Sequence, residues 1–293
     1  MIRNPNMALL RWKSVALGLA LILIGLIVWD GADRRPPDPS QRLPQGSSMV
    51  DLPVSSASLK LASFNIHGGK GTDGVRSLPR IAELLKTADF VGLYEVRAGV
   101  REVGANQAAA LATSCNASWL FAATERHWWS DHFGNGLIYR SPLRSPIRIP
   151  LMGTRGKAFR NAILSTVPLQ DAEVHILAVH IDRESDRRHQ LQTVVDLFLS
   201  LEPPCVLMGD LNTTVSDPLL TKLLEHPEVK SPLHEQFAGR IPSQNIDWIF
   251  TRGLATISAE LTETTASDHP LLQAELIPIA RQTIVPDQKK LQP

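Results

Sequence analysis

Short apolar segments that end on an acid, an amide or a histidine recur between residues 59 and 279. Alternating or continuous apolar character over a few residues is typical of β-strands, and glycine, aspartate and asparagine commonly terminate them. Two longer segments, residues 78–87 and 186–201, have helical periodicity. This pattern predicts an α/β sandwich with a mixed-sheet core, and the strands are expected at residues 59–66, 89–95, 136–140, 161–166, 174–180, 205–210, 246–250 and 271–277.

The polar side chains at or beside these strand ends are the candidate functional residues. They are Asn65, Glu95, His180, Asp210, Asn212, Asp247, Asp268 and His269. Each one alone is explained by turn formation or by a satisfied structural role. Burying eight polar groups at the ends of apolar strands costs free energy unless they interact with one another or with a ligand, and this favours a common site.

The segment Cys205-Val-Leu-Met-Gly-Asp-Leu-Asn-Thr-Thr214 shows how a strand end delivers such groups. Side chains in a strand alternate between its two faces. We therefore expect Asp210 and Asn212 to share one face while Leu211 enters the core.

The types of these residues indicate the chemistry. Carboxylate and amide oxygens without paired thiolates suit Mg²⁺, Mn²⁺ or Ca²⁺ and argue against structural zinc. The two cysteines, Cys115 and Cys205, match no zinc spacing, and they are compatible either with one disulfide or with two buried thiols. Histidines beside carboxylates act as proton carriers or as donors to an oxyanion. Together these groups suit the hydrolysis of a phosphate ester.

Six short motifs follow one another along the chain. They are Ser63-Phe-Asn-Ile-His67, Gly92-Leu-Tyr-Glu-Val96, Ala178-Val-His180, Gly209-Asp-Leu-Asn212, Ile246-Asp-Trp-Ile-Phe250 and Ser267-Asp-His-Pro270. This ordered set resembles the endonuclease/exonuclease/phosphatase superfamily, which includes deoxyribonuclease I, abasic-site endonucleases, neutral sphingomyelinases and inositol polyphosphate 5-phosphatases. The resemblance covers residues 59–279, and within the superfamily the chain looks most like the bacterial metal-dependent hydrolases. It implies a four-layer α/β/β/α sandwich of two packed mixed sheets.

The resemblance also implies a site for Mg²⁺ or Mn²⁺. By matching position, Glu95 is the principal metal ligand, supported by Asn65 and Asp268. Tyr94 departs from the family pattern, because a glutamine commonly precedes the metal-binding glutamate. This departure is expected to alter hydrogen bonding around the carboxylate.

The remaining matched residues are implied to act in catalysis. His269 is the acid/base histidine, held by Asp247, and His180 stabilises charge on the phosphoryl oxygens. Asp210 and Asn212 position or activate the attacking water and bind the phosphate. For the family's additional phosphate-contacting tyrosine or arginine, Arg160 is a candidate, although a solvated strand residue is an equal interpretation.

The N-terminal segment is unlike the rest of the chain. Residues 14–29 carry no charge and are flanked by Trp12 and Trp29, which is typical of a membrane-spanning signal anchor, with a cleaved signal peptide as the alternative. The basic residues before it favour a cytoplasmic N-terminus at residues 1–13 and an extracytoplasmic domain, on the periplasmic side of a bacterial inner membrane. Residues 30–58 are rich in proline and predict a linker, residues 59–279 the catalytic domain, and residues 280–293 a loose tail.

The substrate is less constrained than the reaction. With 30 basic and 29 acidic residues, the chain has no strong net charge, and this does not favour sequence-independent binding to nucleic acid. The predicted function is a metal-dependent phosphodiesterase acting on lipid headgroups or small phosphodiesters. A tethered nuclease cleaving DNA or RNA is the alternative, and an inactive binding module is a third. His127-Trp-Trp129 is interpreted as either a lipid-contacting loop or core packing.

Overall fold

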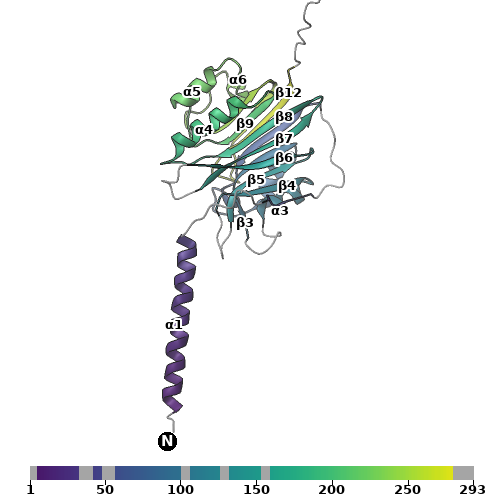
Figure 1. The fold of residues 1–293 in the computed structure, drawn as a ribbon. Helices are drawn as coiled ribbons and strands as arrows, with labels where there is room; N and C mark the ends of the chain where they lie inside the picture. Colours follow the sequence, from purple (N-terminus) through teal and green to yellow (C-terminus); the bar gives the residue numbers. More distant parts are fainter. Residues whose placement is uncertain are drawn as a thin grey trace, which may run out of the picture.

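The computed structural model describes residues 5–32, 42–47, 57–99, 106–125, 132–152 and 159–279. It consists of one long N-terminal helix, α1 (Pro5–Ala32), and a layered domain that contains most of the remaining elements (Figure 1). Within α1, the segment from Trp12 to Trp29 has a mean hydropathy of 2.1 and none of it is buried in the protein. It is long and apolar enough to cross a membrane, a property that signal sequences share.

A seven-stranded sheet forms one half of the domain. Every neighbouring pair in it is antiparallel except β2 and β3. The strands, in spatial order, are β1 (Gln45–Ser47), β4 (Ser118–Ala123), β5 (His132–Tyr139), β3 (Phe90–Ala98), β2 (Leu59–Asn65), β12 (Leu271–Pro278) and β11 (Leu254–Thr262).

Strand β1 lies within the segment that the sequence predicts as a linker. Its three residues pair with β4, with Gly46 opposite Trp119. Only three residues with no apolar side chain form this strand, so no alternating pattern marks it in the sequence. The glycine is needed because a Cβ at Gly46 would lie 2.7 Å from the Trp119 indole nitrogen. This part of residues 30–58 therefore belongs to the sheet edge.

A five-stranded sheet forms the other half. Its parallel pair, β8 and β9, is connected through helix α4 (Arg187–Ser200), in the manner of a βαβ unit. The other pairs are antiparallel. In spatial order the strands are β10 (Asp247–Arg252), β9 (Cys205–Asp210), β8 (Ala172–His180), β7 (Arg160–Leu169) and β6 (Arg144–Leu151).

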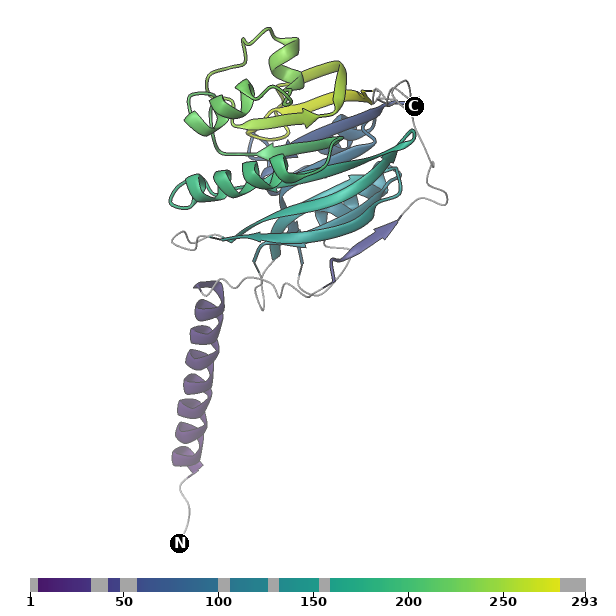
Figure 2. The same cartoon turned by 45° about the horizontal axis from the view of Figure 1, so that its top comes forward.

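The two sheets pack face to face, with helices on their outer faces. In β9, Val206 and Met208 enter the core between the sheets, whereas Leu207 enters the core beneath α4 and α5 (Pro218–Glu225). In β2, Leu61 joins the inter-sheet core and Phe64 packs with α2 (Leu78–Leu85) and α3 (Gln107–Ser114). Each fully buried side chain of this size contributes about 1.5–3 kcal/mol to folding. The layers confirm the predicted α/β/β/α fold, and Figure 2 shows it from a second direction with α1 standing apart.

The helix over residues 78–87 and the helix over residues 186–201 are both present, with slightly shorter bounds. The short elements η1 (His67–Gly69) and α6 (Pro232–Gln236) complete the described domain.

The two cysteines are unpaired thiols. Cys115 is buried in the core beneath α2 and α3, and Cys205 in the core beneath α4 and α5. Because these cores lie on opposite outer faces of the sandwich, the two sulfurs cannot form a disulfide without rearrangement of the fold. Both residues serve as small buried apolar groups.

Gly209 allows β8 and β9 to come close where the sheet approaches the candidate site. Its backbone has a φ of +152°, and a Cβ there would lie 1.9 Å from the carbonyl oxygen of Val179. No other residue type fits at this position without moving a strand. The glycine before Asp210 thus keeps Asp210 in register with His180 on the neighbouring strand.

Candidate active site

Three of the predicted residues form one row across the five-stranded sheet. His180 at the end of β8 pairs with Asp210 at the end of β9, and Asp210 pairs with Asp247 at the start of β10. All three are buried, with at most 2% of their surface exposed. Because directly paired residues in neighbouring strands have adjacent side chains, this register brings a histidine and two carboxylates together.

The seven-stranded sheet adds a fourth buried group to this row. Asn65, the last residue of β2, donates a hydrogen bond from Nδ2 to Asp210 Oδ2 at 3.0 Å. The Ser267 hydroxyl donates to the Asn65 carbonyl at 2.6 Å, and this contact ties the loop between β11 and β12 to the end of β2. The two sheets are therefore joined by polar contacts at the point where the candidate residues meet.

His269 comes from that same loop and is held by Asp247. Its Nδ1 lies 2.7 Å from Asp247 Oδ2, and its Nε2 lies 3.8 Å from Asp210 Oδ2. Burial lowers the pKa of His269, but the hydrogen bond to Asp247 and the charges of Asp247 and Asp210 outweigh it and raise the pKa to about 9. The ring is therefore an imidazolium at neutral pH, oriented by one carboxylate and close to a second.

Burial is also the largest cause of the pKa shifts of Asp210 and His180. Desolvation, followed by the charge of Asp247, raises the pKa of the Asp210 carboxyl above its usual range. Desolvation, followed by the positive charges of Arg160 and His269, holds the pKa of His180 well below its usual value. His180 is therefore neutral, with Nε2 located 3.5 Å from Asp210 Oδ2. Neighbouring groups with displaced pKa values are typical of acid–base sites.

Glu95 does not end its strand, contrary to the sequence prediction. Strand β3 continues to Ala98, and its register with β5 shifts between Leu93 and Val96. Glu95 lies in this bulge with a φ of +58°, a conformation that costs a non-glycine residue about 1–2 kcal/mol. A bulge inserts an extra residue and redirects its side chain, and here it lets the Glu95 carboxylate line the pocket.

Asn212 reaches the site through a turn and not through strand alternation. Strand β9 ends at Asp210, and Asn212 has a φ of +44°. Its backbone N–H donates to Asp210 Oδ1 at 2.9 Å, and its Nδ2 donates to the Ile181 carbonyl at 3.1 Å. The expectation that Leu211 enters the core is correct, but the turn places Asn212 beside Asp210.

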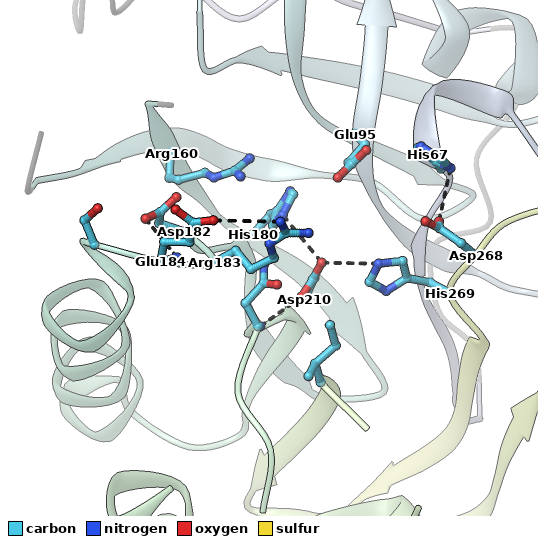
Figure 3. A pocket seen from close by; sticks show the side chains of 13 residues that line it. His67, Glu95, Arg160, His180, Asp182, Arg183, Glu184, Asp210, Asp268 and His269 are labelled. Carbon is cyan, nitrogen blue, oxygen red and sulfur yellow. Dashed lines mark hydrogen bonds and ion pairs between the residues drawn. The ribbon is translucent and has the colours of Figure 1, made fainter. Parts of the chain in front are cut away.

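These side chains line a pocket with a volume of about 610 Å³. Figure 3 shows Glu95, Asp210 and His269 around it, with Arg160 on one side and with His67 and Asp268 on the other. Asn65 and Asp247 contact the lining residues without lining the pocket themselves.

Several lining residues were outside the predicted set or only weakly indicated by the sequence. His67 follows Asn65 closely and its Nδ1 lies 3.2 Å from Asp268 Oδ1. Asp182 and Arg183 follow His180, and a polar segment after a strand end is the signal that would have indicated them. Arg160 lines the pocket and its Nε and Nη1 atoms are buried, so the interpretation as a solvated strand residue is wrong.

Tyr94, which departs from the family pattern, makes its contacts in the core between the sheets and forms no hydrogen bond with the carboxylate of Glu95. Its hydroxyl donates to the Met208 carbonyl in the other sheet at 3.1 Å. Its ring meets the His180 ring edge to face, with centroids 6.2 Å apart. Gly92 makes room for it, because a Cβ there would lie 2.5 Å from the hydroxyl oxygen. Tyr94 therefore supports His180 from the inter-sheet side.

The donor set fits a hard divalent cation. The Glu95 carboxylate forms no hydrogen bond or ion pair within the described part of the chain, although it lines the pocket. Asp268 and Asn65 add oxygen donors at the same end of the sheets. Among the described residues, Asp210, Asp247 and His269 also lie close enough to share an ion. In that trio, however, His269 Nδ1 and Asp247 Oδ2 already form a hydrogen bond with each other at 2.7 Å.

The predicted lipid-contacting or packing residues His127-Trp-Trp129 lie outside the described residues.

Known proteins resemble this chain in sequence. The model of the endonuclease/exonuclease/phosphatase family matches residues 62–269. UPF0294 proteins of Yersinia pseudotuberculosis and Yersinia pestis are each 30% identical over 151 residues, which are 48% of this chain and 55% of theirs. The chain thus spans about half the length of these curated relatives.

Solved structures share the fold. An endonuclease/exonuclease/phosphatase structure from Beutenbergia cavernae has a TM-score of 0.64 at 23% identity and covers 76% of this chain and 72% of its own. A mannosyl-6-phosphatase of Bacteroides thetaiotaomicron has a TM-score of 0.57 at 15% identity, with 75% and 100% covered.

Proposed function

Because this chain belongs to the endonuclease/exonuclease/phosphatase family, whose members hydrolyse phosphoester bonds, we propose that it is a divalent-metal-dependent phosphodiesterase. One observation carries the proposal. An imidazolium held by Asp247 faces the carboxylate of Asp210, in a pocket that is also lined by the carboxylate of Glu95, which has no hydrogen-bond or ion-pair partner among the described residues. Proton donor, proton acceptor and candidate metal ligand thus share one pocket.

Glu95, Asp268 and Asn65 would hold the metal ion, either Mg²⁺ or Mn²⁺. When bound, a divalent ion stabilises negative charge on the phosphoryl oxygens. Carboxylate and amide oxygens are the ligands such ions prefer. The strained backbone of Glu95 supports this assignment, because strain of this kind persists where a function requires it.

Arg160 and His180 are proposed to bind the phosphate. The Nε and Nη1 atoms of Arg160 are buried and have no hydrogen-bond partner among the described residues. A buried guanidinium without a partner is costly unless an anion reaches it. His180 adds a neutral imidazole at the same wall, which suits hydrogen bonding to a phosphoryl oxygen without adding charge.

His269 and Asp210 are proposed to move the protons. The imidazolium of His269 would donate its Nε2 proton to the leaving oxygen, and Asp247 stabilises that charged form. Asp210 would accept a proton from the attacking water, because burial makes its carboxylate a stronger base than one in solvent. Asn212, hydrogen-bonded to Asp210 through its backbone N–H, keeps that carboxylate oriented.

A substrate panel tests the proposed function. The purified full chain in detergent is expected to release product from bis(p-nitrophenyl) phosphate with Mg²⁺ or Mn²⁺, and not after EDTA treatment. It is expected to hydrolyse p-nitrophenyl phosphate, a monoester, more slowly. The same preparation is tested on plasmid DNA, RNA and phospholipid vesicles. A rate on plasmid DNA well above that on the small diester would favour the nuclease alternative. If no substrate yields product with either metal, the enzyme assignment is wrong.

The N-terminal helix motivates a second proposal, that α1 anchors the domain on the extracytoplasmic side of a membrane. The unburied apolar segment Trp12–Trp29 supports it. The basic residues Arg11 and Lys13, which precede the uncharged residues 14–29, support the orientation. An alkaline phosphatase reporter, which is active only outside the cytoplasm, fused after residue 58 is expected to be active. A β-galactosidase reporter at the same junction is expected to be inactive. The reverse pattern would overturn the orientation.

A further inference from the structure

Two arginines, Arg97 on β3 and Arg76 in the loop before α2, lie beside Gly68, next to the pocket. Arg97 Nε lies 2.8 Å, and Arg76 Nη1 3.2 Å, from the position that a Cβ of Gly68 would occupy. Both guanidinium groups therefore border one point. Gly68, with a φ of +59°, leaves the space they occupy. Lys70 forms an isolated β-bridge with Arg76, so a third cation starts from the same short loop.

These cations lack counter-charges within the described part of the chain. The Arg97 guanidinium and the Lys70 ammonium form no hydrogen bond or ion pair there, and Arg76 donates only to the Gly68 carbonyl, at 2.6 Å. Arg80, in the same region, shows the contrast, since both carboxylate oxygens of Asp73 accept its hydrogen bonds. All three side chains are exposed, so an anion from solvent can reach them, and their like charges repel one another less once it is bound.

The position of these cations relates them to the proposed reaction centre. Arg97 lies two residues beyond Glu95 on β3, and two strand residues span about 7 Å. Gly68 follows His67, which lines the pocket and pairs with Asp268. Arg160, the cation proposed to bind the scissile phosphate, lies at the opposite side of the pocket (Figure 3). The cluster thus adjoins the pocket without forming part of its lining.

We propose that Lys70, Arg76 and Arg97 form a subsite for a second phosphate group of the substrate. This inference rests on the proposed function and deepens it by naming the substrate class, a phosphodiester that carries a further phosphate about one sugar ring away. Arginines suit this task because the planar guanidinium presents paired donors to phosphate oxygens. The second phosphate belongs either to a soluble ester or to a phosphorylated lipid headgroup.

Two matched probes test the subsite. The first is the p-nitrophenyl ester of thymidine 5′-phosphate, and the second is the same ester carrying a 3′-phosphate. The full chain in detergent is expected to show a kcat/KM about tenfold higher for the second probe, because a charge-assisted contact is worth about that factor. The higher kcat/KM of the second probe is expected to come from a lower KM, with kcat little changed. Equal values for the two probes would contradict a second-phosphate subsite in this arm.

Variants then assign the preference to the cluster. Arg97→Gln and Lys70→Gln are each expected to reduce the preference for the second probe several-fold. Arg76 is left unchanged because its hydrogen bond to Gly68 supports the loop. Arg144→Gln is the control, because Arg144 is an exposed arginine at the end of the sheet opposite Arg160, paired with Glu173. If Arg97→Gln lowers kcat/KM equally for both probes, the subsite assignment is wrong.

A lipid arm and a binding measurement complete the test. In mixed micelles, phosphatidylinositol 4-phosphate is compared with phosphatidylinositol, and a preference there alone would identify the source as a headgroup. If neither the nucleotide probes nor the phospholipids are hydrolysed, the proposed function is contradicted. Calorimetry with thymidine 3′,5′-bisphosphate and thymidine 5′-phosphate still decides the subsite. The subsite is supported if the bisphosphate binds more tightly than the monophosphate and Arg97→Gln abolishes this difference. It is overturned if the two ligands bind equally tightly and neither the nucleotide assay nor the lipid assay shows a preference for the second phosphate.

Discussion

His269→Gln is expected to lower turnover of bis(p-nitrophenyl) phosphate by about 10²-fold or more, the usual contribution of a positioned acid or base. Glutamine has similar reach but cannot carry the proton that the imidazolium of His269 supplies. The hydrogen bond from the ring to Asp247, at 2.7 Å, and the carboxylate of Asp210 beyond it are specific to this histidine. Initial rates at saturating metal and substrate measure the effect.

A matched histidine provides the control. His175 lies on β8, the strand that also carries His180, and contacts the Thr166 hydroxyl at 3.1 Å, away from the pocket. His175→Gln is expected to retain nearly the full rate. Similar losses for His175→Gln and His269→Gln would show that a histidine-to-glutamine change acts through stability, and a near-normal rate for His269→Gln would refute its proton-transfer role.

Asp247→Asn tests whether Asp247 and His269 act as a unit. This change removes the charge that stabilises the imidazolium while keeping the shape of the side chain. We expect a loss close to that of His269→Gln, and the double variant should lose little more than either single variant, because groups that act together are strongly non-additive. Losses that multiply in the double variant would indicate two independent roles.

The central strands β8 and β9 could be predicted because both of their faces are buried, although β4, an equally buried inner strand, was not predicted. In β8 and β9, every residue from Ile176 to Val179 and from Cys205 to Met208 is apolar and inaccessible to solvent. The edge strand β6 carries no such pattern, whereas the edge strand β10 is buried throughout and was predictable. Strand β6 begins with the exposed residues Arg144 and Ser145, contains two prolines and is fully buried only at Leu151, so neither alternation nor a continuous apolar run marks it in the sequence.

The candidate site could be predicted to the extent that its residues end central strands. His180 and Asp210 do so, and their common row follows from the parallel register of β8 and β9. Glu95 could be named from a motif, but its bulge depends on where β5 pairs with β3, which a period-two pattern cannot reveal. The inward position of Arg160 likewise depends on the crossing of β7 over β5, where its guanidinium lies 6.0 Å from the Phe133 ring.

Glu95→Gln is expected to abolish metal-dependent hydrolysis at millimolar Mg²⁺ and to weaken Mn²⁺ binding by at least about tenfold, since one charged ligand is worth roughly 1.4 kcal/mol or more. Glutamine preserves the size of the side chain and its position in the bulge, so the fold is retained. Electron paramagnetic resonance of free Mn²⁺ reports binding without requiring turnover. Glu225→Gln is the control, because Glu225 is exposed at the end of α5.

The same titration separates two possible metal sites. If the ion is bound at Glu95, His269→Gln leaves the Mn²⁺ affinity near that of the wild type although it removes the activity. If the ion instead binds the trio of Asp210, Asp247 and His269, His269→Gln weakens Mn²⁺ binding and Glu95→Gln does not. We expect the first pattern, because Asp247 and His269 already satisfy each other within hydrogen-bond distance, whereas the carboxylate of Glu95 is held in a strained bulge with no partner in the described chain.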